Sequence, residues 1–177
     1  MLRNGISVGR VFGIRVTLDL SWIVVFLLVC WNLTMVFASW HPAWAIIECG
    51  LLAALAAILF FASVLAHELA HSLVARTQGI PVTEIRLFLF GGVSNLQHEP
   101  TSPEAELATT IVGPITSLVF GGAMLLAATL FVPIVAPEHA LEALAATGPI
   151  GTLLLWLGAV NIGVGLFNLI PGFPLDG

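Results

Sequence analysis

The chain has 177 residues, of which 59% are hydrophobic and 8% are charged, and its mean hydropathy is +1.07. Soluble domains carry about 25% charged residues, so this composition excludes an ordinary soluble domain and predicts an integral membrane protein. The net charge is -5, with five arginines and no lysine, which argues against nucleic acid as a partner. We therefore expect one membrane-embedded domain over residues 1–177.

Four apolar segments follow one another in chain order and predict an all-α membrane protein. The first covers residues 20–38 and is long enough to cross a bilayer of about 30 Å. The second covers 44–76, and at 1.5 Å per residue its length of about 50 Å means that it must project from the membrane or tilt. The third and fourth are expected over 104–132 and 150–170.

Residues 80–97, between the second and third segments, change to an alternating pattern. Interleaved β-branched and aromatic residues, followed by Phe90, Gly91 and Gly92, predict one or two strands with a glycine turn. Strands with unpaired backbone groups cannot lie in lipid, so this hairpin or small sheet must lie at the interface or against the helices. It could bind an extended substrate by strand addition or act as a structural plug, and the pattern favours neither.

The residues most suited to chemistry are His67, Glu68 and His71, within HELAH in the second segment. Residues four apart project from one face of a helix, so the two imidazoles can bind one metal ion. Glu68 lies about 100° around the helix, near enough to act as a general base toward water at the metal. These groups are costly in hydrocarbon without a partner, and a zinc ion would be that partner. The alternative is a chance motif whose histidines are hydrogen-bonded in a core.

The third segment has a clear start and a stripe of small residues. Ser102 is expected to cap the helix, with Pro103 in its first turn. Gly113, Ser117 and Gly121 recur every four residues and would let another helix approach closely. We interpret this stripe as packing rather than chemistry.

Polar residues distinguish the fourth segment. Asn161 and Asn168 are seven residues apart and share one face, which should point into the bundle. The segment ends in NLIPGFPLDG, whose prolines and glycine must unwind the helix where protein or water covers it. Asp176 is then a carboxylate beside a broken helix, available as a third metal ligand.

The arginines indicate the topology. With four spans and a cytoplasmic N-terminus, all five fall on the cytoplasmic side: Arg3, Arg10, Arg15, Arg76 and Arg86. The end of the second segment and the unwound end of the fourth then share that side, so His67, His71 and Asp176 can converge. His41 and His139 lie on the opposite side and are not expected to bind the metal.

In these motifs the chain resembles the intramembrane metalloproteases of the site-2 protease family. The matching pieces are HELAH at 67–71, FGG at 90–92, the pair Gly113-Pro114, and NLIPGFPLDG with its Asp176. SVGRVFGIRVTLDLSW, HSLVARTQGIPV and LFLFGGVSNL are similar to bacterial members that carry a cytoplasmic CBS-domain pair after the membrane core. HExxH is moderately specific alone, but strongly so with a distant NxxPxxPLDG.

The resemblance implies one Zn²⁺ per chain, held by His67, His71 and Asp176. It implies that Glu68 activates water and that Asn168 lies near the reacting carbonyl as an oxyanion or substrate contact. The substrate would be a transmembrane helix of a membrane protein, for example a membrane-anchored regulator, cut in regulated intramembrane proteolysis. The bacterial inner membrane would be the location, with the active site toward the cytoplasm.

The resemblance also has limits, and two other functions remain to be compared. Members of the family commonly have two more transmembrane helices and often a regulatory domain after the LDG motif, which we expect this chain, ending at Gly177, to lack. His98 is a candidate gating or accessory group, although an interfacial histidine is the simpler interpretation. A non-catalytic bundle that holds metal or a client helix would not need Glu68, and a metal transporter should spread its polar residues through the membrane.

Overall fold

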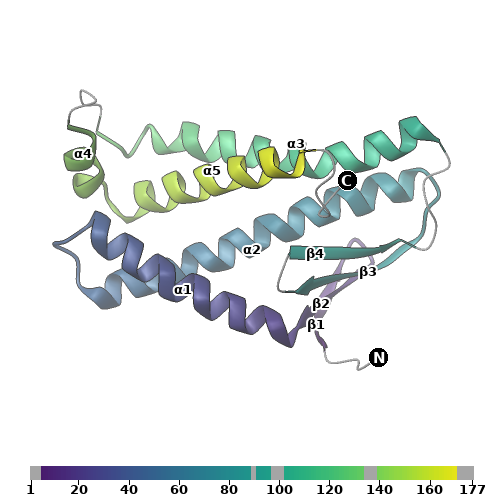
Figure 1. Ribbon diagram of the computed structural model, residues 1–177, viewed down its shortest axis with the longest axis horizontal. Coiled ribbons are helices and arrows are strands. Elements are labelled where there is room, and N and C mark those ends of the chain that lie inside the picture. Colours follow the sequence, from purple (N-terminus) through teal and green to yellow (C-terminus); the bar gives the residue numbers. More distant parts are fainter. Residues whose placement is uncertain (1–4, 89–90, 97–101, 134–138, 171–177) are drawn as a thin grey trace.

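The computed structural model describes residues 5–88, 91–96, 102–133 and 139–170, and for 91–96 it describes the backbone. Four of its helices are long and apolar enough to cross a membrane. They are α1 (Leu20–Trp40), α2 (Ile46–Thr77), α3 (Pro103–Ala128) and α5 (Pro149–Asn168). They lie side by side along the long axis of the molecule, and the short α4 (Ala140–Ala146) lies at one end (Figure 1). The predicted four-span architecture is confirmed.

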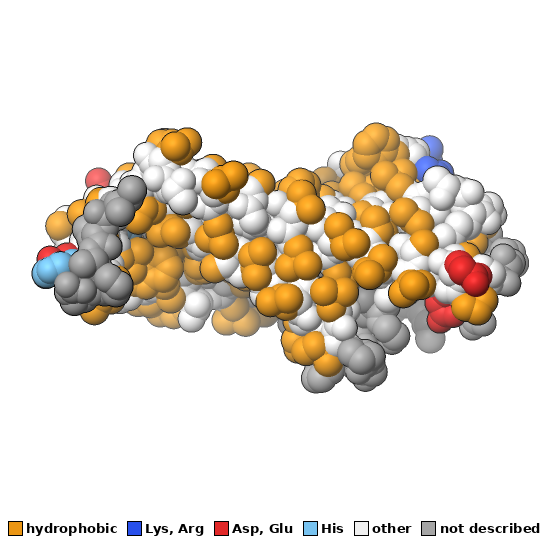
Figure 2. Space-filling model, turned by 90° about the horizontal axis from the view of Figure 1, so that it is seen from above, with side chains coloured by type: hydrophobic (Ala, Val, Ile, Leu, Met, Phe, Trp, Pro, Cys, Tyr) orange, Lys and Arg blue, Asp and Glu red, His pale blue; other side chains and the backbone are white. Residues whose placement is uncertain are grey.

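The surface agrees with a membrane location. Apolar side chains cover the middle of the molecule, whereas charged side chains gather near its two ends (Figure 2). Large apolar residues remain exposed along the spans, among them Leu27, Leu28, Val119 and Leu126, each more than half exposed. In water such a surface would be unstable, so these side chains are suited to contact lipid tails.

A four-stranded sheet lies beside the C-terminal part of α2 (Figure 1). Its order is β1-β2-β3-β4, formed by β1 (Gly5–Val11), β2 (Ile14–Asp19), β3 (Val82–Phe88) and β4 (Gly91–Leu96). The β2–β3 pair is parallel and the outer two pairs are antiparallel. The sequence predicted β3 and β4 within residues 80–97, but the N-terminal hairpin that doubles the sheet was not predicted.

The N-terminal hairpin is fixed by its turn and by its buried face. Phe12 and Gly13 form a two-residue turn with φ angles of 51° and 77°, and positive values at both positions are what a type I′ hairpin turn requires. Ile14 is fully buried against Ala75 of α2 and Ile85 of β3. The sheet is therefore attached to the end of α2 through an apolar core.

The predicted stripe on α3 is a packing surface over part of its length. A Cβ on Gly121 would lie 2.8 Å from the backbone nitrogen of Ile162 on α5, and one on Gly158 would lie 2.6 Å from Cγ of Leu125. The two helices thus approach as closely as glycine permits. Ser102 caps α3 by accepting a hydrogen bond from the Ala105 backbone N–H, as predicted.

Gly121→Val should destabilise the bundle, because two added methyl groups and a Cβ must push α5 away from α3. We expect a loss of about 1–3 kcal/mol, measured as a lower thermal unfolding midpoint in detergent. Gly122→Val is the matched control, since a Cβ there meets nothing within 4 Å. Equal midpoints for the two variants would contradict the close approach of α3 and α5.

Candidate metal centre

His67 and His71 project from one face of α2 and meet inside the bundle. Both side chains are almost fully buried, and their Nε2 atoms lie 3.1 Å apart. The four-residue spacing on the helix produces this approach, as the sequence predicted. Two donor nitrogens are thus directed at one small volume within a membrane-spanning helix.

Groups on α3 orient both imidazoles through contacts with their Nδ1 atoms. His71 Nδ1 lies 2.6 Å from the backbone oxygen of Thr109, and because a carbonyl can only accept, that nitrogen carries the proton. His67 Nδ1 lies 2.8 Å from Oγ of Ser117. With its Nδ1 protonated, His71 presents the lone pair of Nε2 toward the other ring, which is the arrangement usual for metal-binding histidines.

Gly113 keeps the space in front of the two Nε2 atoms clear. A Cβ built on Gly113 would lie 2.7 Å from His67 Nε2 and closer still to Nε2 of His71. Only a residue without a side chain fits at this position of α3. The predicted stripe therefore allows close approach here too, but Gly113 and Ser117 lie against the histidine pair of α2, a neighbour that the stripe alone did not predict.

The arrangement fits a zinc ion. Zn–N distances of about 2.0–2.1 Å at tetrahedral angles place two ligand nitrogens roughly 3.3 Å apart, close to the 3.1 Å observed here. Neutral imidazole nitrogens are also donors that zinc prefers. The described residues contain no group of three or more His, Cys, Asp or Glu side chains around one point. The predicted third ligand, Asp176, and the accessory candidate His98 both lie outside the described residues.

Glu68 and Asn168 are also placed by the structure. Glu68 is buried on α2, directly after His67 in the chain. Asn168 is the last residue of α5, and its Oδ1 is buried without a hydrogen-bond partner among the described residues. The other predicted polar residue of this face, Asn161, is buried and donates to the carbonyl of Leu157, so its amide is used within its own helix.

The remaining described histidines belong to other parts of the molecule. His41 is buried after the end of α1, 2.8 Å from Oγ1 of Thr152 and stacked on Trp44. His139 is exposed at the start of α4 and lies 3.3 Å from Glu142. As expected from the sequence, neither of these two histidines lies with the histidine pair in the C-terminal half of α2.

Comparison with known proteins identifies the family. Residues 55–177 match the model of peptidase family M50. Relatives named "Putative zinc metalloprotease", from Synechocystis sp. and Mycobacterium tuberculosis, are 39% and 35% identical over 99% of this chain. The chain spans 43% and 42% of those two relatives, less than half of their length.

A solved structure supports the same family. The site-2 protease of Methanocaldococcus jannaschii superposes with a TM-score of 0.67 at 31% sequence identity, covering 98% of this chain and 68% of that one. The match to the family model extends from α2, with its histidine pair, through the last residue of the chain. The chain therefore belongs to peptidase family M50, and its resemblance to the site-2 proteases is confirmed.

Proposed function

We propose that this chain is the membrane core of a zinc endopeptidase that hydrolyses a peptide bond in or near a transmembrane helix of its substrate. The observation that carries the proposal is the convergence of two buried Nε2 atoms, of His67 and His71, on a membrane-spanning helix. Membership of a peptidase family and the zinc metalloprotease names of its relatives support the same chemistry.

Each residue of the site has a role that follows from its chemistry. His67, His71 and Asp176 would hold one zinc ion, since catalytic zinc sites commonly have three protein ligands and an open position. When bound, zinc would polarise the scissile carbonyl and make water a stronger nucleophile. Glu68 takes the proton from the attacking water and later gives it to the leaving amine.

Asn168 is suited to hold the substrate backbone. Its buried Oδ1 accepts no hydrogen bond from a described residue, and a buried acceptor without a donor is costly. A backbone N–H of an unwound substrate segment would satisfy it. The amide N–H groups of the same side chain are the groups that an oxyanion contact would need, so the side chain suits either of the two roles.

The charge distribution supports a particular orientation in the membrane. The described arginines, Arg10, Arg15, Arg76 and Arg86, lie on the sheet or at the end of α2 beside it. Arginine-rich ends of membrane proteins face the cytoplasm, so these positions support a cytoplasmic N-terminus and a metal centre toward that side. In a bacterial inner membrane, this arrangement suits release of a membrane-anchored regulator into the cytoplasm.

Glu68→Gln should separate catalysis from metal binding. We expect the variant to retain about one zinc per chain, measured by elemental mass spectrometry, while cleavage of a single-span test protein falls by about 10²–10⁴-fold. Asp176→Ala should instead lower the zinc content. Glu48→Gln is the matched control, because Glu48 is at the other end of α2, where its carboxylate accepts from the Ala45 N–H. Cleavage by Glu68→Gln at the parent rate would contradict the proposed base, and a zinc-loaded parent that cuts no transmembrane helix would favour a non-catalytic bundle.

Gly113→Ala should weaken zinc binding by at least ~10-fold, because the new methyl group would occupy the space between the two Nε2 atoms. Competition with a fluorescent chelator measures the affinity. Gly163→Ala is the control, since its Cβ would meet nothing within 4 Å. Unchanged zinc affinity in a folded Gly113→Ala protein would show that the metal does not lie between these nitrogens.

Ser117→Ala removes the group that orients His67, so we expect zinc affinity to fall by about 10–100-fold with the fold intact. The matched control is Ser63→Ala, in which the lost hydroxyl donates only to the Phe60 carbonyl of its own helix. The same chelator competition applies. If both serine variants bind zinc like the parent, Ser117 has no orienting role.

A further inference from the structure

The outer face of the sheet carries paired like charges. Arg10 on β1 and Arg15 on β2 are direct cross-strand partners, and Arg15 is in register with Glu84 on β3. Side chains of such partners share one face of the sheet and lie close together. Two like charges in this position destabilise the hairpin, so the pair needs negative charge nearby.

Glu84 already has two partners. Its Oε1 accepts a hydrogen bond from Thr17 at 2.7 Å and lies 3.7 Å from Arg86 Nη2. Within the part of the chain that the structure describes, Arg10, Arg15 and Arg76 form no ion pair with an acidic side chain. Three guanidinium groups on this part of the surface are therefore available to bind an anion.

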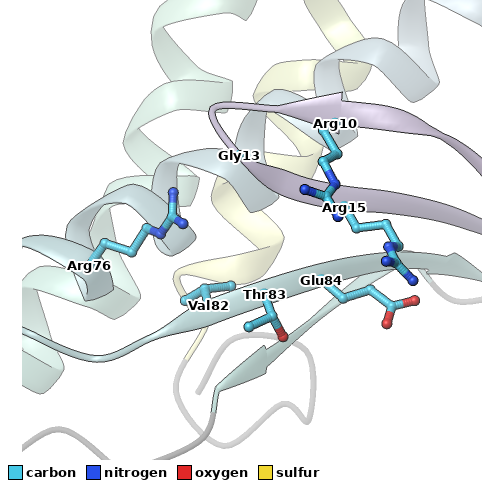
Figure 3. Close-up of a pocket in the computed structure, with 7 residues that line it drawn as sticks. All are labelled: Arg10, Gly13, Arg15, Arg76, Val82, Thr83 and Glu84. Carbon is cyan, nitrogen blue, oxygen red and sulfur yellow. The ribbon is translucent and has the colours of Figure 1, made fainter.

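These three arginines line a cavity of about 400 Å³, together with Gly13, Val82, Thr83 and Glu84. Figure 3 shows Arg76 of α2 on one side of this cavity and the two strand arginines on the other. Arg76 is held in place because its Nη1 donates to the backbone oxygen of Phe12 at 2.6 Å, which leaves its other N–H groups for a ligand. Guanidinium groups arranged in this way are suited to a phosphate, which accepts several charge-assisted hydrogen bonds at once.

Apolar side chains beside the arginines indicate the source of the phosphate. Phe12, at the tip of the hairpin, is 69% exposed and has a φ angle of 51°, a strained conformation for a bulky residue. Val8 on the edge strand β1 is 63% exposed. The carbonyl of Phe12 accepts a hydrogen bond from Arg76, which is one residue before the end of the candidate span Ile46–Thr77, so the hairpin tip lies beside the end of that span. A free phosphate would give these apolar groups no partner, whereas a lipid would.

We propose that the cavity binds the phosphate of an anionic phospholipid, with Phe12 against the glycerol and acyl region of the same lipid. The arginines neutralise the phosphodiester, and the apolar tip enters the interface, as at other basic membrane-contacting surfaces. The bound lipid would tie the sheet to the bilayer beside α2. The binding requires neither the zinc ion nor the proteolytic activity.

The test is native mass spectrometry of the full chain in detergent, titrated with phosphatidylglycerol or phosphatidylcholine. We expect the parent to retain one phosphatidylglycerol and little phosphatidylcholine. Arg10→Gln should weaken that binding by about tenfold, as the loss of one charge-assisted hydrogen bond implies. Arg86→Gln is the control, because it removes the same charge from the same sheet, where Arg86 lies beside Glu84. Its affinity should stay within about twofold of the parent.

Phe12→Asn distinguishes a lipid from a free anion. Asn-Gly is the preferred pair for this turn, so the variant should fold at least as stably as the parent while binding phosphatidylglycerol several-fold more weakly. Equal binding of the two lipids, or equal loss in Arg10→Gln and Arg86→Gln, would overturn the proposal. So would full displacement of the lipid by millimolar inorganic phosphate together with unchanged lipid binding by Phe12→Asn, the behaviour of a free-phosphate site.

Discussion

Polar side chains inside a membrane bundle require partners from neighbouring helices, and this requirement governs how α2 and α3 are packed. His71 finds the Thr109 carbonyl and His67 finds the Ser117 hydroxyl. Their partners and Gly113 are spaced by four residues along α3, so one face of that helix serves the whole pair. A shift of one helical turn between the two helices would remove the Ser117 hydroxyl from His67 and place a larger side chain opposite the Nε2 atoms.

The same face of α3 has two purposes along its length. Near Gly113 the missing side chain leaves room at the histidines, whereas near Gly121 it lets α5 approach to backbone contact. α5 in turn ends at Asn168, whose buried Oδ1 lacks a partner among the described residues. Packing and chemistry therefore depend on the same small residues, which explains why the glycines of α3 cannot be understood from only one of the two roles.

The sequence was informative where a pattern is local. Segment length and apolar content predicted the four spans, alternation predicted β3 and β4, and a four-residue spacing predicted the histidine pair. The N-terminal hairpin was missed, although Ile14 and Val16 alternate with exposed residues, because glycines and arginines interrupt the apolar pattern.

The groups that orient the histidines could not be predicted from the residue types in the sequence. Thr109 acts through its backbone oxygen, which every residue possesses, so no sequence signal marks it. Ser117 was visible only as a small residue, because its hydroxyl gains its partner from the register of two helices. Asp176 was predicted as a ligand from a motif alone, and it lies outside the described residues.

The parallel pairing of β2 with β3 has a consequence for assembly of the protein. Thr17 and Glu84, which are hydrogen-bonded across this pair, are 67 residues apart, and both α1 and α2 lie between them. A contact across so long a loop forms late, because chain entropy opposes it until the intervening segments are ordered. The N-terminal hairpin must therefore wait, with its edge unpaired, until two helices have entered the bilayer and returned. Closure of the sheet thus reports that the N-terminal hairpin and the end of α2 lie on the same side, with both of the first two spans between them complete.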